Sequence, residues 1–495
     1  MKEKIRTILE AIHAHSLEKP DALCLADNKI SLTYSEACLR IQKCAGFLFS
    51  KGVKKGDIVL IRVSQTVLYA ICYYAIQYVG AISCPIDKAI TTERVSEIVD
   101  EIGAKWYADA KIEDAPSGPE PLNLKEMFSY EVPLEEKHFG ERIAAPNDIA
   151  DIIYTTGTTG KSKGIMVSHK TDIAIAENVV DSVSMTGDER EMVTSQIGHA
   201  LGVRRMNAAM YIGSACIIAD KFVFVNSFFK LLDKYSVTAI TFVPSILKGI
   251  LDGSGERIRE YNGRLHYIQL GAAPLPESLK EEALRLLPDV RLYNTYGATE
   301  SGCTIILEFS KYLNKKNCIG RTTVNTKLIF VDENRREVNA VDEKSAAYLS
   351  FEGDMNMSGY INAPELTATV LSNGRIYTND IGYLGSDGLV YMLGRSGEII
   401  NLGGFKINPV EIETAVQRYP GIADCACVPK EDELLGQVPK LFVVMESGQE
   451  VDLKDLSVFL RKYLEDYKVP KEIEIISSIP RTFNGKIVRR KLMES

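Results

Sequence analysis

Residues 155–164 read Thr155-Thr156-Gly157-Thr158-Thr159-Gly160-Lys161-Ser162-Lys163-Gly164 and directly follow a largely apolar run, residues 149–154. Hydroxyls, glycines with unhindered N–H groups and two ammonium charges suit a polyphosphate, because the backbone can approach and donate to anionic oxygens. The spacing is not that of a Walker loop, since Gly157 and Gly160 enclose only two residues. Taken alone, the composition is also typical of a surface turn. The segment predicts a phosphate-binding loop, and the rest of the chain decides between the two interpretations.

Four further motifs follow in order: Tyr293-Asn294-Thr295-Tyr296-Gly297-Ala298-Thr299-Glu300, Tyr377-Thr378-Asn379-Asp380-Ile381-Gly382, Gly394-Arg395 with Asn401-Leu402-Gly403-Gly404-Phe405-Lys406-Ile407, and Pro480-Arg481-Thr482-Phe483-Asn484-Gly485-Lys486. With the loop, they resemble the motifs of the adenylate-forming (AMP-binding) superfamily, in particular the acyl-CoA synthetases that act on fatty or aromatic acids. The resemblance extends over nearly the whole chain. It implies an AMP-forming acid–thiol ligase that uses ATP, Mg²⁺ and CoA.

The resemblance also implies a nucleotide site. The residues expected to bind ATP are Thr155, Thr156, Gly157, Thr158, Thr159 and Lys163 at the phosphates, Asn294, Thr295, Tyr296 and Gly297 at adenine, Thr299 at the α-phosphate, and Asp380 and Arg395 at the ribose. Glu300 would bind Mg²⁺. Lys486 would stabilise the charge that develops as the carboxylate attacks the α-phosphate. Singly, an isolated aspartate or a lysine near a terminus is usually solvated. The order of the motifs favours the functional interpretation.

The acyl site is expected around two further segments. His199, within residues 196–202, resembles the residue that lines the acyl pocket, and Gly271, Ala272 and Ala273 resemble the wall between that pocket and adenine. The expected catalytic residues are therefore Lys486, Thr155, Glu300 and His199. Arg204 and Arg205 stand where relatives are commonly apolar. They are either solvated on one helix face or reach the acyl pocket and select a polar or anionic acid.

The thiol acceptor is expected to be CoA. Gly403 and Gly404 resemble the segment along which a pantetheine arm runs, where the absence of side chains permits a close approach. The basic residues Lys486, Arg489, Arg490 and Lys491 could meet the phosphates of CoA. An acyl-carrier protein loaded in trans is an alternative acceptor. A noncatalytic nucleotide-binding relative is a third possibility, which the intact Glu300, Asp380 and Lys486 disfavour.

Apolar runs of strand length alternate with helical patterns, which predicts an α/β fold with mixed sheets flanked by helices. We expect two domains, an ATP- and acyl-binding domain at 1–395 and a mobile α+β lid at 396–495, joined at Ser396-Gly397. The 495 residues carry a net charge of −8, which gives no long-range attraction for nucleic acid or anionic membrane. The uncharged stretch 63–86 contains Gly80 and Pro85 and predicts a buried helix followed by a strand, without a membrane span. The N-terminus lacks the apolar core of a signal peptide, and the ten cysteines are scattered, so we expect a cytoplasmic enzyme with reduced thiols.

Overall fold

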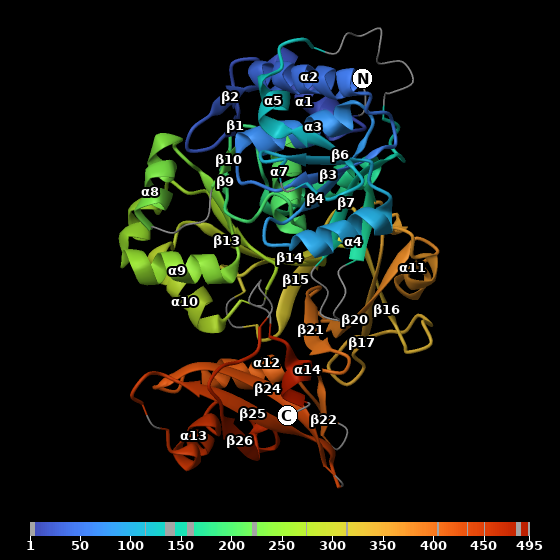
Figure 1. Ribbon diagram of the computed structural model, residues 1–495. Coiled ribbons are helices and arrows are strands. Elements are labelled where there is room, and N and C mark those ends of the chain that lie inside the picture. Colours follow the sequence, from blue (N-terminus) through green and yellow to red (C-terminus); the bar gives the residue numbers. More distant parts are fainter. Residues whose placement is uncertain are drawn as a thin grey trace.

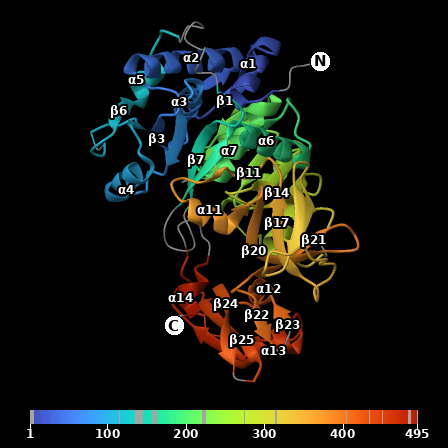
Figure 2. The ribbon, with the colours of Figure 1, turned by 90° about the vertical axis from the view of Figure 1, so that its right-hand side faces the viewer.

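The computed structural model describes residues 5–113, 115–133, 144–155, 163–219, 225–273, 275–312, 315–402, 405–432, 434–449, 451–481 and 487–493. These residues form a large N-terminal part with two mixed sheets and flanking helices, and a smaller C-terminal part with a sheet of its own (Figures 1 and 2). The predicted α/β fold class is confirmed. The proposed division between residues 395 and 396 stays a prediction.

The largest sheet spans the whole N-terminal part. Its strands, in spatial order, are β16 (Lys327–Val331), β17 (Ala347–Glu352), β20 (Arg375–Leu384), β21 (Val390–Arg395), β15 (Cys318–Thr322), β14 (Gly302–Glu308), β13 (Arg291–Ala298), β12 (Tyr267–Leu270), β11 (Ala239–Phe242), β9 (Arg190–Val193), β10 (Ala215–Ile218), β1 (Leu23–Ala26) and β2 (Ser31–Thr33), with β19 (Leu371–Ser372) beside β20. From β1 to β13 the neighbours are parallel, and from β13 to β16 they are antiparallel. Strands β10, β11 and β12 are buried throughout, as parallel strands covered on both faces require.

The second sheet carries the phosphate-loop segment. Its order is β18 (Gly359–Tyr360), β8 (Lys163–Ser168), β7 (Ile149–Thr155), β4 (Ile82–Ile86), β3 (Ile58–Arg62), β5 (Trp106–Asp109) and β6 (Glu120–Asn123). The uncharged stretch 63–86 forms the buried helix α3 (Val67–Tyr78) and strand β4, as predicted. None of the helices in the described ranges combines the length and the apolar character that crossing a bilayer requires.

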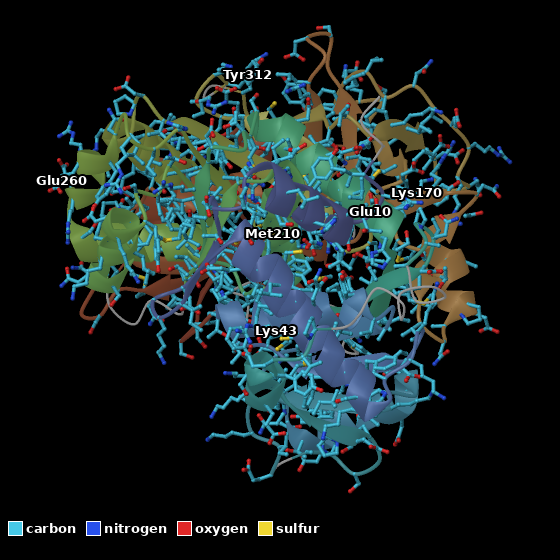
Figure 3. The ribbon with its side chains drawn as sticks, turned by 90° about the horizontal axis from the view of Figure 1, so that it is seen from above. Glu10, Lys43, Lys170, Met210, Glu260 and Tyr312 are labelled. Atoms are coloured by element: carbon cyan, nitrogen blue, oxygen red, sulfur yellow. The ribbon has the colours of Figure 1, made fainter. Side chains whose placement is uncertain are left out.

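Helices cover both sheets. In the N-terminal part they are α1 (Ile8–Glu18), α2 (Tyr34–Lys51), α4 (Thr92–Ile102), α5 (Leu124–Ser129), α6 (His169–Val183), α7 (Ala200–Ile212), α8 (Val225–Lys234), α9 (Pro244–Ser254), α10 (Glu277–Leu286) and α11 (Pro364–Val370), besides α3. Seen from above, Lys43 marks the blue lobe of α2 and Glu260 the green lobe that contains α8 to α10, while Met210 of α7 lies near the middle (Figure 3).

The C-terminal part has its own sheet and core. The sheet order is β23 (Phe405–Ile407), β22 (Ile400–Leu402), β25 (Gly436–Met445) and β24 (Ile422–Asp432), with β26 (Glu472–Ile475) beside β25. Helices α12 (Pro409–Val416), α13 (Leu453–Leu460) and α14 (Arg489–Met493) belong to the same part. The apolar core between α12, α13 and the sheet is separate from the N-terminal cores. All ten cysteines of the chain are free thiols, nine of them buried, in agreement with the prediction.

Helix α7 lies between the two large sheets, and adjacent arginines bind one sheet each. Arg204 is 4% exposed; its Nη1 bonds to Asp172 on α6 and lies 3.5 Å from Asp151 Oδ2 on β7. Arg205 is fully buried and pairs with Glu191 on β9. Both earlier interpretations of these arginines need correction. Neither side chain is solvated, and both guanidinium groups are held by carboxyl groups inside the fold instead of serving as a free cation for the acyl pocket.

The two carboxyls around Arg204 predict a pH-dependent stability. Burial, followed by the neighbouring Asp151, raises the pKa of Asp172 to about 8. Between the ordinary value of 3.8 and about 8, the folded chain holds a proton that the unfolded chain has lost, so the stability falls as the pH rises through this window. We expect the midpoint of thermal unfolding to fall by about 1 °C per pH unit more in the natural protein than in Asp172→Asn. Asp181→Asn, at an exposed position of the same helix, is the control. Equal slopes in all three proteins would contradict the assignment.

Candidate functional site

Three of the predicted nucleotide residues meet at the Asp380 carboxylate. Tyr296, on β13, donates its hydroxyl to Oδ2 at 2.5 Å, and Arg395 donates Nε to Oδ1 at 3.0 Å. The strand register places Arg395 directly opposite Asp380 in the β20–β21 pair. Burial, followed by the charge of Asp380, raises the pKa of Tyr296 well above its usual value, so the phenol remains a donor. The tyrosine and the arginine each donate to one oxygen of Asp380. Both oxygens can therefore accept a further hydrogen bond.

The predicted adenine segment is the end of β13. Gly297 is needed there, because a Cβ at this position would lie 1.9 Å from the carbonyl oxygen of Gly302 on the paired strand β14. Among the described residues, Asn294 Oδ1 is buried and has no hydrogen-bond partner. Thr299 lies in the turn after the strand. A buried acceptor without a donor is uncommon in proteins.

A second cluster joins Glu300 to the phosphate-loop strand. Tyr360 donates its hydroxyl to Glu300 Oε1 at 2.8 Å, and Lys163 Nζ lies 5.2 Å from the centre of the Tyr360 ring. Tyr360 stands on β18, which pairs with β8, the strand that begins at Lys163. The sequence analysis missed Tyr360. Its Gly-Tyr pair carries no pattern of its own, and only the pairing of β18 with β8 brings it to Glu300.

The predicted acyl residues lie at the start of α7 and the end of β12. His199 precedes α7, and its Nε2 lies 3.1 Å from Asp87 Oδ2. Gly271 directly follows β12. It lies so close to Thr295 that a Cβ on Gly271 would be 2.6 Å from Thr295 Oγ1. Ala272 has a φ of +68°, a left-handed conformation that non-glycine residues rarely adopt. Ala273, the third predicted wall residue, follows in the same bend. The chain therefore turns sharply at this wall.

Several predicted residues lie outside the described part of the chain or are described only by their backbone. Thr156, Gly157, Thr158, Thr159, Gly403, Gly404 and Lys486 fall outside it, and Thr155 is described by its backbone alone. The flanking positions are ordered by strand pairing, with Thr155 opposite Lys163, Leu402 opposite Phe405 and Arg481 opposite Ile487.

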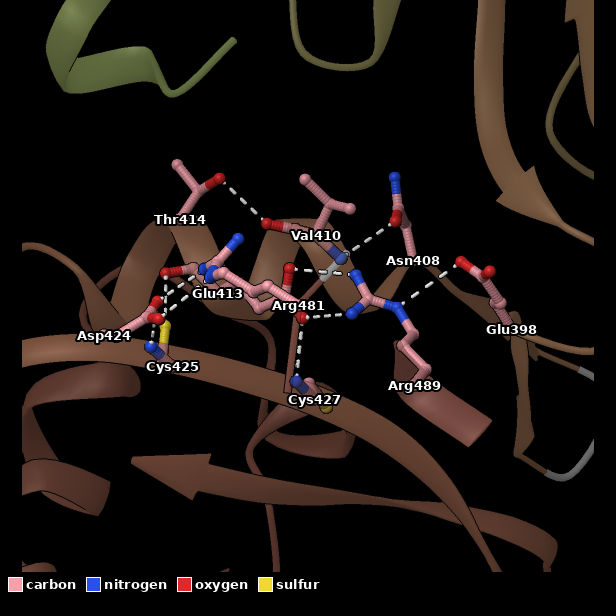
Figure 4. A network of polar contacts seen from close by, with 10 residues as sticks. All are labelled: Glu398, Asn408, Val410, Glu413, Thr414, Asp424, Cys425, Cys427, Arg481 and Arg489. Carbon is pink, nitrogen blue, oxygen red and sulfur yellow. Dashed lines mark hydrogen bonds and ion pairs between the residues drawn. The ribbon is translucent and has the colours of Figure 1, made fainter. Parts of the chain in front are cut away.

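Ion pairs anchor both sides of the segment that contains Lys486 (Figure 4). Arg481 binds Asp424 with both Nε and Nη2, at 3.1 and 2.7 Å. Arg489, 8% exposed, binds both oxygens of buried Glu413, at 2.9 and 3.0 Å, and its Nε lies 3.4 Å from Glu398. The expectation that Arg489 offers its charge to CoA therefore needs correction. Its guanidinium is committed to two carboxylates of the lid.

Two family models match the chain. The model described as AMP-binding enzyme matches residues 12–361, and the model of the AMP-binding enzyme C-terminal domain matches residues 411–486. This chain belongs to the AMP-binding enzyme family. The resemblance seen in the sequence is confirmed, and with it the enzyme class, an AMP-forming acid–thiol ligase that uses ATP, Mg²⁺ and CoA.

Known proteins match over nearly the full length. 4-Coumarate–CoA ligase 2 of Nicotiana tabacum is 29% identical over 94% of this chain and 89% of its own. Peroxisomal OPC-8:0-CoA ligase 1 of Arabidopsis thaliana is 26% identical over 94% of this chain and 88% of its own. The fold matches ATP-bound MatB from Rhodopseudomonas palustris with a TM-score of 0.86 at 22% identity, over 99% of both chains. It also matches o-succinylbenzoate CoA synthetase from Bacillus subtilis, in complex with ATP and magnesium. That match has a TM-score of 0.83 at 20% identity and covers 98% of this chain and 99% of the other.

The described residues fit the nucleotide and the metal that the family uses. The buried oxygen of Asn294 can accept from an exocyclic amino group such as that of adenine. Asp380 would offer acceptors to hydroxyls, and Glu300 would supply the carboxylate oxygen that Mg²⁺ prefers.

The bond from Tyr360 to Glu300 predicts a magnesium effect. Tyr360→Phe removes the donor that orients the proposed metal ligand without changing the size of the ring. We expect the Mg²⁺ concentration for half-maximal ATP–pyrophosphate exchange to rise about tenfold, the scale of one hydrogen bond to a charged group. Tyr391→Phe is the matched control, because the Tyr391 hydroxyl donates to Asp387 at 2.7 Å in an exposed turn. Equal Mg²⁺ requirements in the two variants would show that Tyr360 does not orient Glu300.

Proposed function

We propose that this chain activates a carboxylic acid with ATP and transfers the acyl group to the thiol of CoA. In the first step a carboxylate oxygen attacks the α-phosphorus, the bond to the bridging oxygen breaks, and pyrophosphate leaves. In the second step the thiol sulfur attacks the acyl carbon, its proton is lost to solvent, and AMP leaves. The observation that carries the proposal is the meeting of Tyr296, Asp380 and Arg395 at one carboxylate.

The chain itself contributes positioning and charge neutralisation, which are the main requirements of phosphoryl substitution. Asp380 accepts from the ribose, while Tyr296 and Arg395 fix its orientation. Lys163, with the loop residues Thr155, Thr156, Gly157, Thr158 and Thr159, binds the terminal phosphates. Lys486 neutralises charge in the transition state. Glu300 would hold Mg²⁺, which would supply positive charge to neutralise the phosphates.

The acid is selected without the α7 arginines, because both guanidinium groups are engaged by buried carboxyl groups. The residues that remain are His199 with its partner Asp87, Val243 at the end of β11, and the sharply bent wall at Gly271 and Ala272. A polar pair beside an apolar wall favours an acid with both an apolar body and a hydrogen-bonding group. We also propose that the enzyme acts in the cytoplasm.

Adenylation is tested by acid-dependent ATP–pyrophosphate exchange over aliphatic, aromatic and dicarboxylic acids. We expect exchange with at least one class, and a loss of about a hundredfold or more in Lys486→Ala with little change in ATP affinity, because the lysine acts on charge that appears only in the transition state. Lys454→Ala, at an exposed position of α13, is the control for removing a lysine from the lid. Silence of the natural protein across all three classes would overturn the proposal. A normal rate in Lys486→Ala would overturn the role of the lysine alone.

The acceptor is tested by offering preformed acyl-adenylate to CoA, to pantetheine and to a holo-acyl-carrier protein. The relatives that are known as CoA ligases favour CoA. Lys491 is exposed on α14, and none of the ion pairs between described residues joins it to the carboxylates that engage its neighbour Arg489. Lys491→Glu should raise the KM for CoA about three- to tenfold and leave transfer to pantetheine unchanged, because pantetheine lacks the nucleotide phosphates. Efficient transfer to the carrier protein with none to CoA would identify the carrier protein as the acceptor. The assignment of the adenylation step would be unaffected.

A further inference from the structure

Arg205 is the largest fully buried side chain of the described residues, and it starts a chain of hydrogen bonds that ends at the proposed adenine wall. Its Nε and Nη2 bind the two oxygens of Glu191, at 2.7 and 2.5 Å. Its Nη1 donates to Gln269 Oε1 on β12. Gln269 Nε2 lies 3.3 Å from Thr295 Oγ1, and that hydroxyl lies 2.9 Å from the carbonyl oxygen of Leu270.

The direction of every bond in this chain follows from the chemistry of its first member. A guanidinium only donates, so Gln269 must turn its oxygen to Arg205 and its amino group to Thr295. The hydroxyl of Thr295 then accepts from Gln269 and directs its own proton to Leu270. Arg205 therefore fixes the orientation of a hydroxyl that it does not touch.

The last two residues in this series of hydrogen bonds belong to, or directly adjoin, the two segments assigned to adenine. Thr295 lies in the β13 segment, and Leu270 directly precedes Gly271, the first residue of the wall. The bond between them joins the two segments at the point where a Cβ on Gly271 would lie 2.6 Å from Thr295 Oγ1. The backbones of β12 and β13 are paired as far as Leu270 and Asn294, and this hydrogen bond continues the link between wall and strand at the next residue.

We propose that Arg205 and Gln269 are positioning residues for the nucleotide, which act through Thr295 to fix the wall at Gly271 against the adenine segment of β13. This rests on the proposed function, which assigns these two segments to adenine. A buried arginine–carboxylate pair is by itself weak evidence for stability, since apolar residues of equal volume often serve as well. Unlike such apolar residues, an arginine determines which group donates and which accepts in the neighbouring hydrogen bonds.

The test is the affinity for ATP, measured by calorimetry in the absence of acid, together with the melting temperature. Thr295→Val removes the hydroxyl, and Gln269→Glu keeps the acceptor for Arg205 but loses the donor to Thr295. Each should weaken ATP binding about three- to tenfold, the scale of one hydrogen bond, and the double variant should be no weaker than Thr295→Val. Thr295→Ser, which keeps the hydroxyl, should restore the affinity.

Thr241→Val is the matched control. Thr241 donates to Glu191 at 2.5 Å in the same buried cluster, from β11, which lies on the opposite side of β12 from the strand of Thr295. It should lower the melting temperature as Thr295→Val does and change the ATP affinity less than twofold. Equal affinities in Thr241→Val, Thr295→Val and Gln269→Glu, or effects of the last two that multiply in the double variant, would overturn the positioning role. Gln269→Met replaces Gln269→Glu if the latter does not fold. A natural protein that binds no ATP would overturn the proposed function as well, which separates the two failures.

Discussion

The carboxylate of Asp380 is the contact on which the arrangement of the site depends. It receives the hydroxyl of Tyr296 from β13 and the guanidinium of Arg395 from β21, so one side chain ties together the adenine segment, the ribose segment and the last strand before the lid. The strands themselves cannot fix these side chains relative to one another, because β20 and β13 are separated by β21, β15 and β14 in the sheet. The side chains of Tyr296 and Asp380 nevertheless meet directly, and Arg395 on the neighbouring strand bonds to the second carboxylate oxygen.

The same stretch of chain carries the connection into the C-terminal part. Arg395 bonds to Asp380, whereas Glu398, three residues later, lies against Arg489 of the lid. Between them Gly397 has a φ of +86°, a conformation that glycine adopts without strain. Arg489 and Arg481 hold the two sides of the lysine segment by carboxylates of the lid. The Arg395–Asp380 contact, the turn at Gly397 and the segment that contains Lys486 are thus joined by short polar links. A rotation at Gly397 would move the turn and the lysine segment together.

Much of the fold and part of the site could be predicted from the sequence. Apolar runs of strand length predicted strands, and β11 and β12 are buried throughout, because a strand covered on both faces has no polar alternation. The ordered motifs predicted the neighbours Tyr296, Asp380 and Arg395. The sequence did not reveal the partners of buried charges. Arg204 and Arg205 read as solvated or as substrate ligands, because their carboxylates lie 14 to 53 residues away along the chain. Tyr360 was missed for the same reason.

The affinity of the protein for ATP relative to 2′,3′-dideoxy-ATP tests the role of Asp380 most directly. A carboxylate that accepts from both ribose hydroxyls should make the natural protein bind ATP at least about tenfold more tightly than the analogue that lacks them. In Asp380→Asn, which keeps the size of the side chain, that preference should largely disappear, while the affinity for the dideoxy analogue changes little. The same preference in both proteins, or none in the natural protein, would contradict the assignment of Asp380 to the ribose.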